Sequence, residues 1–201
     1  MKMGGVHRLT DAYLALEMGM IGSIVSVFGM QAAMRLRSEE LAWRADLVLA
    51  TATRRRAWVA SHVLLAVLGT AGIILVGGLA SGIGYAAAAS DPTEVGRMLA
   101  AAAVQIPAAC VLVGIVVAVF GLVPGWTTAT WGALVGFLLV GEFGTVFNLP
   151  RWVMDLSPFG HVPRLPGGAL DAAPLVWLSV VAAALVAVGF SAFGMRDVGR
   201  G

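Results

Sequence analysis

The sequence is poor in lysine, histidine and cysteine, and each shortage excludes a kind of chemistry. The lone lysine is Lys2, so the Gly-Lys-Ser/Thr of an ATP-binding P-loop is absent. His7, His62 and His161 are far apart, and with Cys110 as the one cysteine they form no metal-ligand pair and no disulfide. A Gly-x-Ser-x-Gly nucleophile elbow is also absent. We therefore expect no enzyme, and no catalytic, cofactor-binding or metal-binding residue.

Charge is scarce as well. The 201 residues are 12% charged and 59% hydrophobic, and the mean hydropathy is +0.90. A soluble domain of this size would need more polar surface, so we expect a protein of the lipid bilayer. A net charge of +2 does not indicate nucleic acid, because the arginines gather at the ends of apolar runs, as the positive-inside rule predicts.

The long apolar runs predict an all-α fold, a polytopic membrane helix bundle with about five transmembrane helices in a single transmembrane domain. A span needs about 20 apolar residues. The expected spans are residues 13–34, 58–85, 94–123, 127–147 and 175–193. Pro107 should kink the third span. The proline-rich residues 148–173 are expected to form an outer interfacial loop.

Small and capping residues predict how these helices meet and begin. In the first span, a small-residue face is made of Gly19, Gly22, Ser23, Ser26 and Gly29. Gly78 and Gly82 have the spacing of close helix contacts. Trp58 and Tyr85 fit interfacial aromatic belts. Before the third span, Asp91 is a candidate N-cap and Glu94 occupies the capping-box position.

One polar segment, residues 35–56, interrupts the apolar pattern. It holds six of the thirteen Lys+Arg and three of the eleven Asp+Glu. The positive-inside rule places it in the cytoplasm, which puts the N-terminus outside and the C-terminus inside the plasma membrane. Ser38 is a candidate N-cap of a short amphipathic helix, with Glu39 and Glu40 in its first turn. Such a helix suits docking to a soluble partner, although a solvated connector fits the same charges.

Three polar residues are expected inside or near the membrane. Glu17 lies one to two turns inside the first span, where it could face a polar cavity, pair with Gln105 or reach the interface. Glu142 lies close to the outer end of its span, where a headgroup-level position is the simpler interpretation. Either carboxylate is a candidate for a substrate path.

Two motifs resemble those of a known family. The first comprises Arg35-Leu36-Arg37-Ser38-Glu39-Glu40, Leu49-Ala50-Thr51, Arg54-Arg55-Arg56-Ala57-Trp58 and Ser61-His62; the second is residues 149–163, Leu-Pro-Arg-Trp-Val-Met-Asp-Leu-Ser-Pro-Phe-Gly-His-Val-Pro. With the lead-in of residues 9–15, they resemble the actinobacterial ABC-2 type permeases of the family of polyketide-antibiotic exporters. The likeness covers nearly the whole chain and corresponds to the C-terminal part of the permease.

The resemblance implies a permease subunit of an ABC-2 type exporter that moves a hydrophobic compound outward, with ATP and Mg bound by a partner ATPase subunit. It implies an ATPase-coupling helix containing Ser38, Glu39, Glu40, Trp43 and Arg44. It also implies an inner-surface anchor made by Arg54, Arg55 and Arg56. Further permease helices would come from another chain or a second copy. The family has glycine where Trp43 stands and glutamate where Asp46 stands.

Two other classes of function remain open at this point. The chain could be a non-transporting assembly or anchoring subunit derived from a truncated permease. It could also be an ion-coupled carrier that uses Glu17 or Glu142. An ATPase and the remaining helices as partners favour export, whereas transport driven by a proton or sodium gradient without ATP favours a carrier.

Overall fold

The structure is a computed structural model of the chain and describes residues 3–41, 55–143 and 147–195. Within those ranges the fold is all-helical, as the sequence predicts, and contains no strand. The elements are α1 (Met3–Leu41), α3 (Arg55–Ala89), α4 (Thr93–Ala103), α5 (Ile106–Leu122), η1 (Pro124–Ala129), α6 (Thr130–Phe143), α7 (Arg151–Met154), η2 (Pro158–His161) and α8 (Ala172–Met195).

Four helical segments of the described chain are long and apolar enough to cross a membrane: Arg8–Glu39, Ala57–Ala89, Thr93–Leu122 and Ala172–Met195. The expected fourth span, residues 127–147, is divided between the 3₁₀ helix η1 and the 14-residue α6. At 1.5 Å per residue α6 is about 21 Å long, which is shorter than the roughly 30 Å hydrocarbon core. The described residues thus contain four full-length segments, and the fifth expected span is not confirmed.

The first helix does not stop where the sequence suggested. α1 continues through Ser38, Glu39 and Glu40 to Leu41. Ser38 is therefore not an N-cap, because its hydroxyl donates to the Arg35 carbonyl oxygen at 3.0 Å within the same helix. No glycine or proline between residues 35 and 41 forces a break, so the apolar helix continues into the charged segment.

The third expected span is broken before its proline. α4 ends at Ala103 and α5 begins at Ile106, with Pro107 in the first turn of α5. Proline has no N–H to donate to the carbonyl four residues earlier, so it favours a new helix start over a continuous helix. At the break, the Gln105 N–H bonds to the Ala102 carbonyl at 3.0 Å. The predicted irregularity at Pro107 is confirmed.

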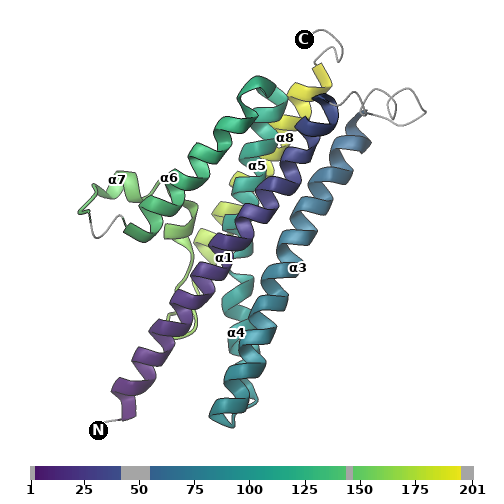
Figure 1. The fold of residues 1–201 in the computed structure, drawn as a ribbon. Coiled ribbons are helices and arrows are strands. Elements are labelled where there is room, and N and C mark those ends of the chain that lie inside the picture. Colours follow the sequence, from purple (N-terminus) through teal and green to yellow (C-terminus); the bar gives the residue numbers. More distant parts are fainter. Residues whose placement is uncertain (1–2, 42–54, 144–146, 196–201) are drawn as a thin grey trace.

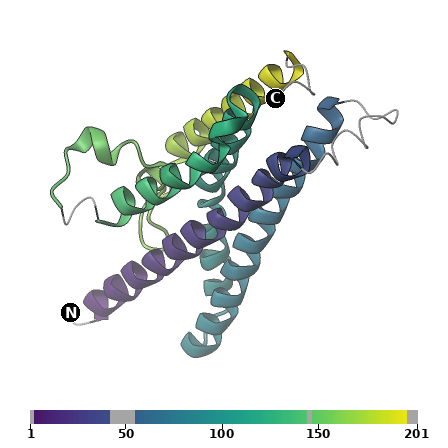
Figure 2. The same ribbon diagram turned by 45° about the horizontal axis from the view of Figure 1, so that its top comes forward.

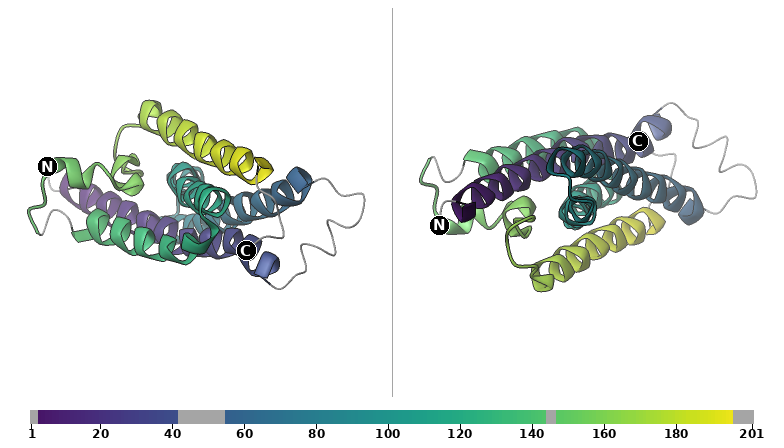
Figure 3. Two further views of the ribbon diagram at one scale, coloured as in Figure 1. Left: turned by 90° about the horizontal axis from the view of Figure 1, so that it is seen from above. Right: turned by 90° about the horizontal axis from the view of Figure 1, so that it is seen from below.

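α5 lies at the centre of the bundle. α5 belongs to the segment Thr93–Leu122, in which 67% of the most apolar 18-residue stretch is buried. The corresponding share in the other three segments is 22–39%. Seen end-on, α5 lies between α8 on one side and α1 with α6 on the other (Figure 3). A Cβ on Gly121 would meet the Gly189 carbonyl oxygen, and a Cβ on Gly189 would meet that of Val117. The crossing of α5 and α8 is therefore close enough to require glycine.

The α3–α4 hairpin confirms the predicted small-residue contact. A Cβ on Gly78 would meet Ala102, and one on Gly82 would come within 3.1 Å of the Val95 Cα. Both glycines of α3 thus permit the close approach of α4. On α1, Gly29 likewise faces Thr70 and Val113.

The ends of α1, α5 and α8 lie at one end of the bundle with the start of α3, whereas α1 starts at the opposite end (Figures 1 and 2). At the shared end, Leu36, Trp58, Phe120 and Phe193 are buried in one hydrophobic cluster. The rings of Phe120 and Phe193 are stacked with centroids 5.5 Å apart, and Trp58 is 6.1 Å from Phe193. Trp58 is therefore packed in the core of the bundle, and its depth at the membrane interface stays a prediction.

Candidate functional site

A cavity of about 550 Å³ lies in the half of the bundle away from the α1–α3 connection. Its walls come from the N-terminal half of α1, the α4–α5 break, the end of α6 and the residues that follow α7. Pockets of 300–1,000 Å³ accommodate drug-sized ligands. The cavity is thus the best candidate for a binding site among the described residues.

The floor of this cavity contains two buried polar side chains. Gln105 is 6% exposed and Ser23 is 9% exposed, and both line the cavity. Gly22 leaves room for Gln105, because a Cβ at position 22 would lie 2.8 Å from the Gln105 Cβ. Within the described ranges, neither the Gln105 amide nor the Ser23 hydroxyl has a hydrogen-bond partner. Both groups remain available to a ligand or to water.

The mouth of the cavity is charged. Arg8 and Asp11 of α1 and Arg164 of the α7–α8 connection line it. Gly167 has φ +102°, and a Cβ there would lie 2.7 Å from the Asp11 Cβ. Both the backbone conformation and the close approach require glycine at this position.

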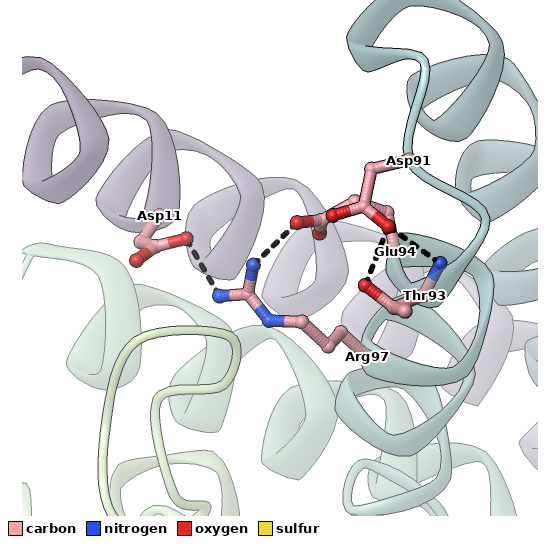
Figure 4. Close-up of polar contacts among 5 residues, drawn as sticks. All are labelled: Asp11, Asp91, Thr93, Glu94 and Arg97. Carbon is pink, nitrogen blue, oxygen red and sulfur yellow. Dashed lines mark hydrogen bonds and ion pairs between the residues drawn. The ribbon is translucent and has the colours of Figure 1, made fainter.

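Asp11 belongs to an ion-pair network that joins α1 to α4 (Figure 4). One guanidinium nitrogen of Arg97 donates to Asp11 Oδ1 at 2.9 Å and the other donates to Glu94 Oε1 at 2.6 Å. The Glu94 side chain is 11% exposed, and its Oε2 is buried without a partner in the described structure. The predicted capping-box role of Glu94 is wrong, because this carboxylate binds Arg97 of the next turn.

Asp91 performs the predicted capping of the third span. Its Oδ1 accepts hydrogen bonds from the Thr93 hydroxyl at 2.7 Å and from the Thr93 N–H at 2.9 Å (Figure 4). These two bonds, the hydroxyl first, hold the pKa of Asp91 below its usual value. The start of α4, beside the ion-pair network, is fixed in this way.

The three intramembrane candidates are not brought together. Gln105 lies on the cavity, but Glu17 is not among the lining residues and instead accepts a hydrogen bond from Ser81 of α3 at 2.8 Å. The suggested pair between Glu17 and Gln105 is therefore not formed. Glu142 lies in the last turn of α6, and its side chain is outside the described part.

The structure describes only some of the residues that the resemblance assigns to the ATPase-coupling helix and the inner-surface anchor. Ser38 is exposed and Glu39 is partly exposed at the end of α1. Glu40, Arg55 and Arg56 lie within helices, but their side chains are not described. Trp43, Arg44 and Arg54 fall outside the described residues.

The sequence did not predict the charged residues at the mouth of the cavity or the ion-pair network beside it. Arg8, Asp11, Arg97 and Arg164 were not predicted as site residues. One signal was available, because Arg97 follows Glu94 by three residues in an apolar helix, a spacing that permits an ion pair. The contact with Asp11 joins residues 86 positions apart, and no local pattern predicts it.

Four long apolar segments in the described chain, one of them buried between the other three, define the chain as a polytopic α-helical membrane protein. Residues 1–194 match the family model described as "Multidrug efflux system permease Rv1217c, C-terminal domain", and the chain belongs to this family. It is also 41% identical over 202 residues to the Multidrug efflux system permease protein Rv1217c of Mycobacterium tuberculosis (strain ATCC 25618 / H37Rv). That match covers 98% of this chain but 36% of the relative's length. The chain thus belongs to a family of permease C-terminal domains and spans about a third of the length of its relative.

Proposed function

We propose that this chain is the membrane-spanning permease part of an ABC-2 type exporter, which moves a hydrophobic compound such as an antibiotic or a lipid-like molecule out across the plasma membrane. The observation that carries the proposal is the family match over residues 1–194. In this proposal ATP and Mg bind to a separate ATPase subunit, as the resemblance to ABC-2 type permeases implies, and these 201 residues contain no P-loop of their own. Further permease helices, from another chain or a second copy, complete the translocation path.

The proposed contact with the ATPase is the tip between α1 and α3. Both helices carry arginines at this end, and Ser38, Glu39 and Glu40 lie on α1 just beyond its apolar part. We place this tip in the cytoplasm and the start of α1 outside, as the positive-inside rule favours. Arg54, Arg55 and Arg56 would then anchor α3 at the inner surface, and Trp43 and Arg44 would belong to the same contact.

The packing next to the tip supports a lever mechanism. Leu36 and Trp58 flank the tip, and both are buried in the cluster that contains Phe120 of α5 and Phe193 of α8. Packed interiors transmit displacement, because side chains there have little free volume. A push from the ATPase on the tip would therefore move α5 and α8 together with α1, which lines the cavity at its other end.

Charge reversal at the tip tests this proposal. The tagged protein is purified from its own host, and the recovered ATPase subunit and its ATP turnover are measured for wild type and for Glu39→Arg/Glu40→Arg. Asp155→Arg is the matched control, because Asp155 is exposed in the α7–η2 turn and has no side-chain partner among the described residues. We expect at least a tenfold loss of ATPase recovery in the double variant and no loss in the control.

Two outcomes contradict the proposal. Equal ATPase recovery and turnover in both variants would remove the coupling role of the tip. Transport by the wild-type complex that follows a proton or sodium gradient and does not need ATP would replace the exporter by an ion-coupled carrier.

A further inference from the structure

We propose that the cavity between α1 and the α7–α8 connection is a binding site for an anionic amphiphile, a molecule with an apolar body, hydrogen-bonding oxygens and a phosphate or carboxylate group. The proposal concerns binding alone and holds whether or not the chain takes part in export. It follows from the floor, the walls, the mouth and the depth of the cavity.

The floor indicates hydrogen bonding to the ligand. Polar side chains buried in a protein nearly always have a partner, which is a protein group, a water molecule or a ligand. Gln105 and Ser23 are both at least nine-tenths buried, line the cavity and have no side-chain hydrogen bond to another described residue. The amide offers two donors and an acceptor, and the hydroxyl offers one donor. Hydroxyl, carbonyl or ester oxygens of a ligand satisfy both groups.

The walls indicate an apolar body. Leu16 of α1 faces the cavity together with Phe159, Val162 and Pro163 of the α7–α8 connection. The helix side of the wall is open, because a Cβ built on Gly19 meets no atom within 4 Å. A flexible apolar chain or ring system fits such a surface, as in most pockets for small molecules.

The charged residues at the mouth indicate the sign of the charge that the ligand carries. Arg8 and Arg164 line it, and neither forms an ion pair within the described structure. The one carboxylate at the mouth, Asp11, is already bound to Arg97. Guanidinium groups form strong, often bidentate bonds with phosphate and carboxylate. An anionic group at the mouth is therefore favoured over a cationic one.

The depth of the site matches that of an amphiphile in a bilayer. With 1.5 Å per residue along α1, Gly22 lies about 20 Å from Arg35, and Asp11 lies about 36 Å from it. If Arg35 marks one edge of a hydrocarbon core about 30 Å thick, the floor lies inside the opposite leaflet and the mouth lies at its headgroups. The ligand can come from that leaflet as an anionic lipid, or from solution as a free amphiphilic acid.

Equilibrium binding to the full chain in detergent tests the proposal. The probes are radiolabelled phosphatidylglycerol, phosphatidylcholine and dodecanoate in a scintillation proximity assay. Gly19→Leu places a bulky side chain at the cavity wall, where a Cβ meets no atom within 4 Å. Gly72→Leu is its matched control, because Gly72 is an exposed helical glycine of α3 whose Cβ would also meet no atom within 4 Å. Arg8→Gln/Arg164→Gln removes the cations of the mouth, and Gln105→Leu removes the amide of the floor.

We expect wild type and Gly72→Leu to bind an anionic probe at least tenfold more tightly than phosphatidylcholine. Gly19→Leu and the double arginine variant should lose at least tenfold in affinity, and Gln105→Leu should bind more weakly than wild type. Binding of phosphatidylglycerol without dodecanoate assigns the site to a membrane lipid, and binding of both assigns it to free amphiphiles as well. Equal affinity in Gly19→Leu and Gly72→Leu, or no preference for either anionic probe, would overturn the proposal.

Discussion

Among single residues, Arg97 forms the ion pair that joins α1 to α4. The Arg97 side chain is 42% exposed, yet its guanidinium binds both Asp11 of α1 and the nearly buried Glu94 of α4 (Figure 4). An exposed ion pair contributes little to stability, but removal of one partner from a buried carboxylate leaves that charge without compensation. The importance of Arg97 therefore comes from Glu94, whose second oxygen already lacks a partner among the described residues.

Arg97→Met should lower the free energy of unfolding by about 1–3 kcal/mol, because it leaves Glu94 Oε1 unsatisfied as well. Glu94→Gln added to this variant should restore part of the loss, since it removes the uncompensated charge. Arg151→Met, at an exposed arginine of α7, is the control and should change stability by less than about 0.5 kcal/mol. Thermal unfolding in detergent measures all three variants, and an Arg97→Met protein as stable as the control would contradict this account.

Asp91 should make the start of α4 less stable at low pH. The pKa of its carboxyl is lowered in the folded protein by the Thr93 hydroxyl and N–H. The ionised Asp91 carboxylate therefore stabilises the start of α4 fully when the pH is above its pKa in the unfolded chain, near 3.8. This stabilisation is lost as the pH falls through the lower pKa of the folded protein. Hydrogen exchange of residues 93–97, corrected for intrinsic rate, should lose protection below about pH 4 in wild type but less so in Asp91→Asn, which keeps an acceptor that does not titrate. The same pH profile in both proteins would show that Asp91 is not responsible.

At the scale of elements, the contact between α5 and α8 depends on missing side chains. Gly121 lies against the Gly189 carbonyl, Gly189 lies against that of Val117, and a Cβ on Gly114 would lie 3.1 Å from the Ala182 carbonyl oxygen. Without a hydrophobic driving force between helices in lipid, such close packing is a main source of association. The central position of α5 therefore depends on glycines of two different helices.

Gly121→Ala should push α8 away from α5 and lower the free energy of unfolding by about 1–3 kcal/mol, because the added methyl meets backbone that cannot rotate aside. Gly136→Ala in α6 is the matched control, since a Cβ there meets no atom within 4 Å. It should stabilise the protein by up to about 1 kcal/mol through helix propensity. Chemical denaturation monitored by circular dichroism compares the two, and a Gly121→Ala variant at least as stable as Gly136→Ala would contradict the close crossing.

The elements also show which features a sequence can predict. The break before Pro107 and the contact of Gly78 and Gly82 depend on local chemistry, and both were predicted. The end of α1 was not, because Ser38 fits an N-cap equally well as an interior helix residue that bonds its own turn. The contact of Gly121 with Gly189 depends on how two distant helices cross, which neither glycine encodes alone.

At the scale of the whole molecule, two ends of the bundle have different characters. One end carries the arginine-rich tip and the buried aromatic cluster beside it. The other half contains the cavity, which is assembled from α1, the α4–α5 break, α6 and the α7–α8 connection. Gln105 was predicted as a polar residue of interest, but its place in one cavity with Ser23 and Arg164 results from the packing of four separate segments. The tertiary fold, rather than any motif, creates the site.

Both the coupling role of the tip and the outer position of the cavity depend on which end of the bundle faces the cytoplasm. Cysteine labelling in intact cells measures this directly, after Cys110→Ala removes the one native thiol. Ser38→Cys reports the tip, and Asp155→Cys reports the α7 end; both positions are exposed. The account predicts that a membrane-impermeant maleimide labels Asp155→Cys in intact cells and Ser38→Cys only after the membrane is permeabilised. Labelling of Ser38→Cys in intact cells, with Asp155→Cys protected, would contradict it.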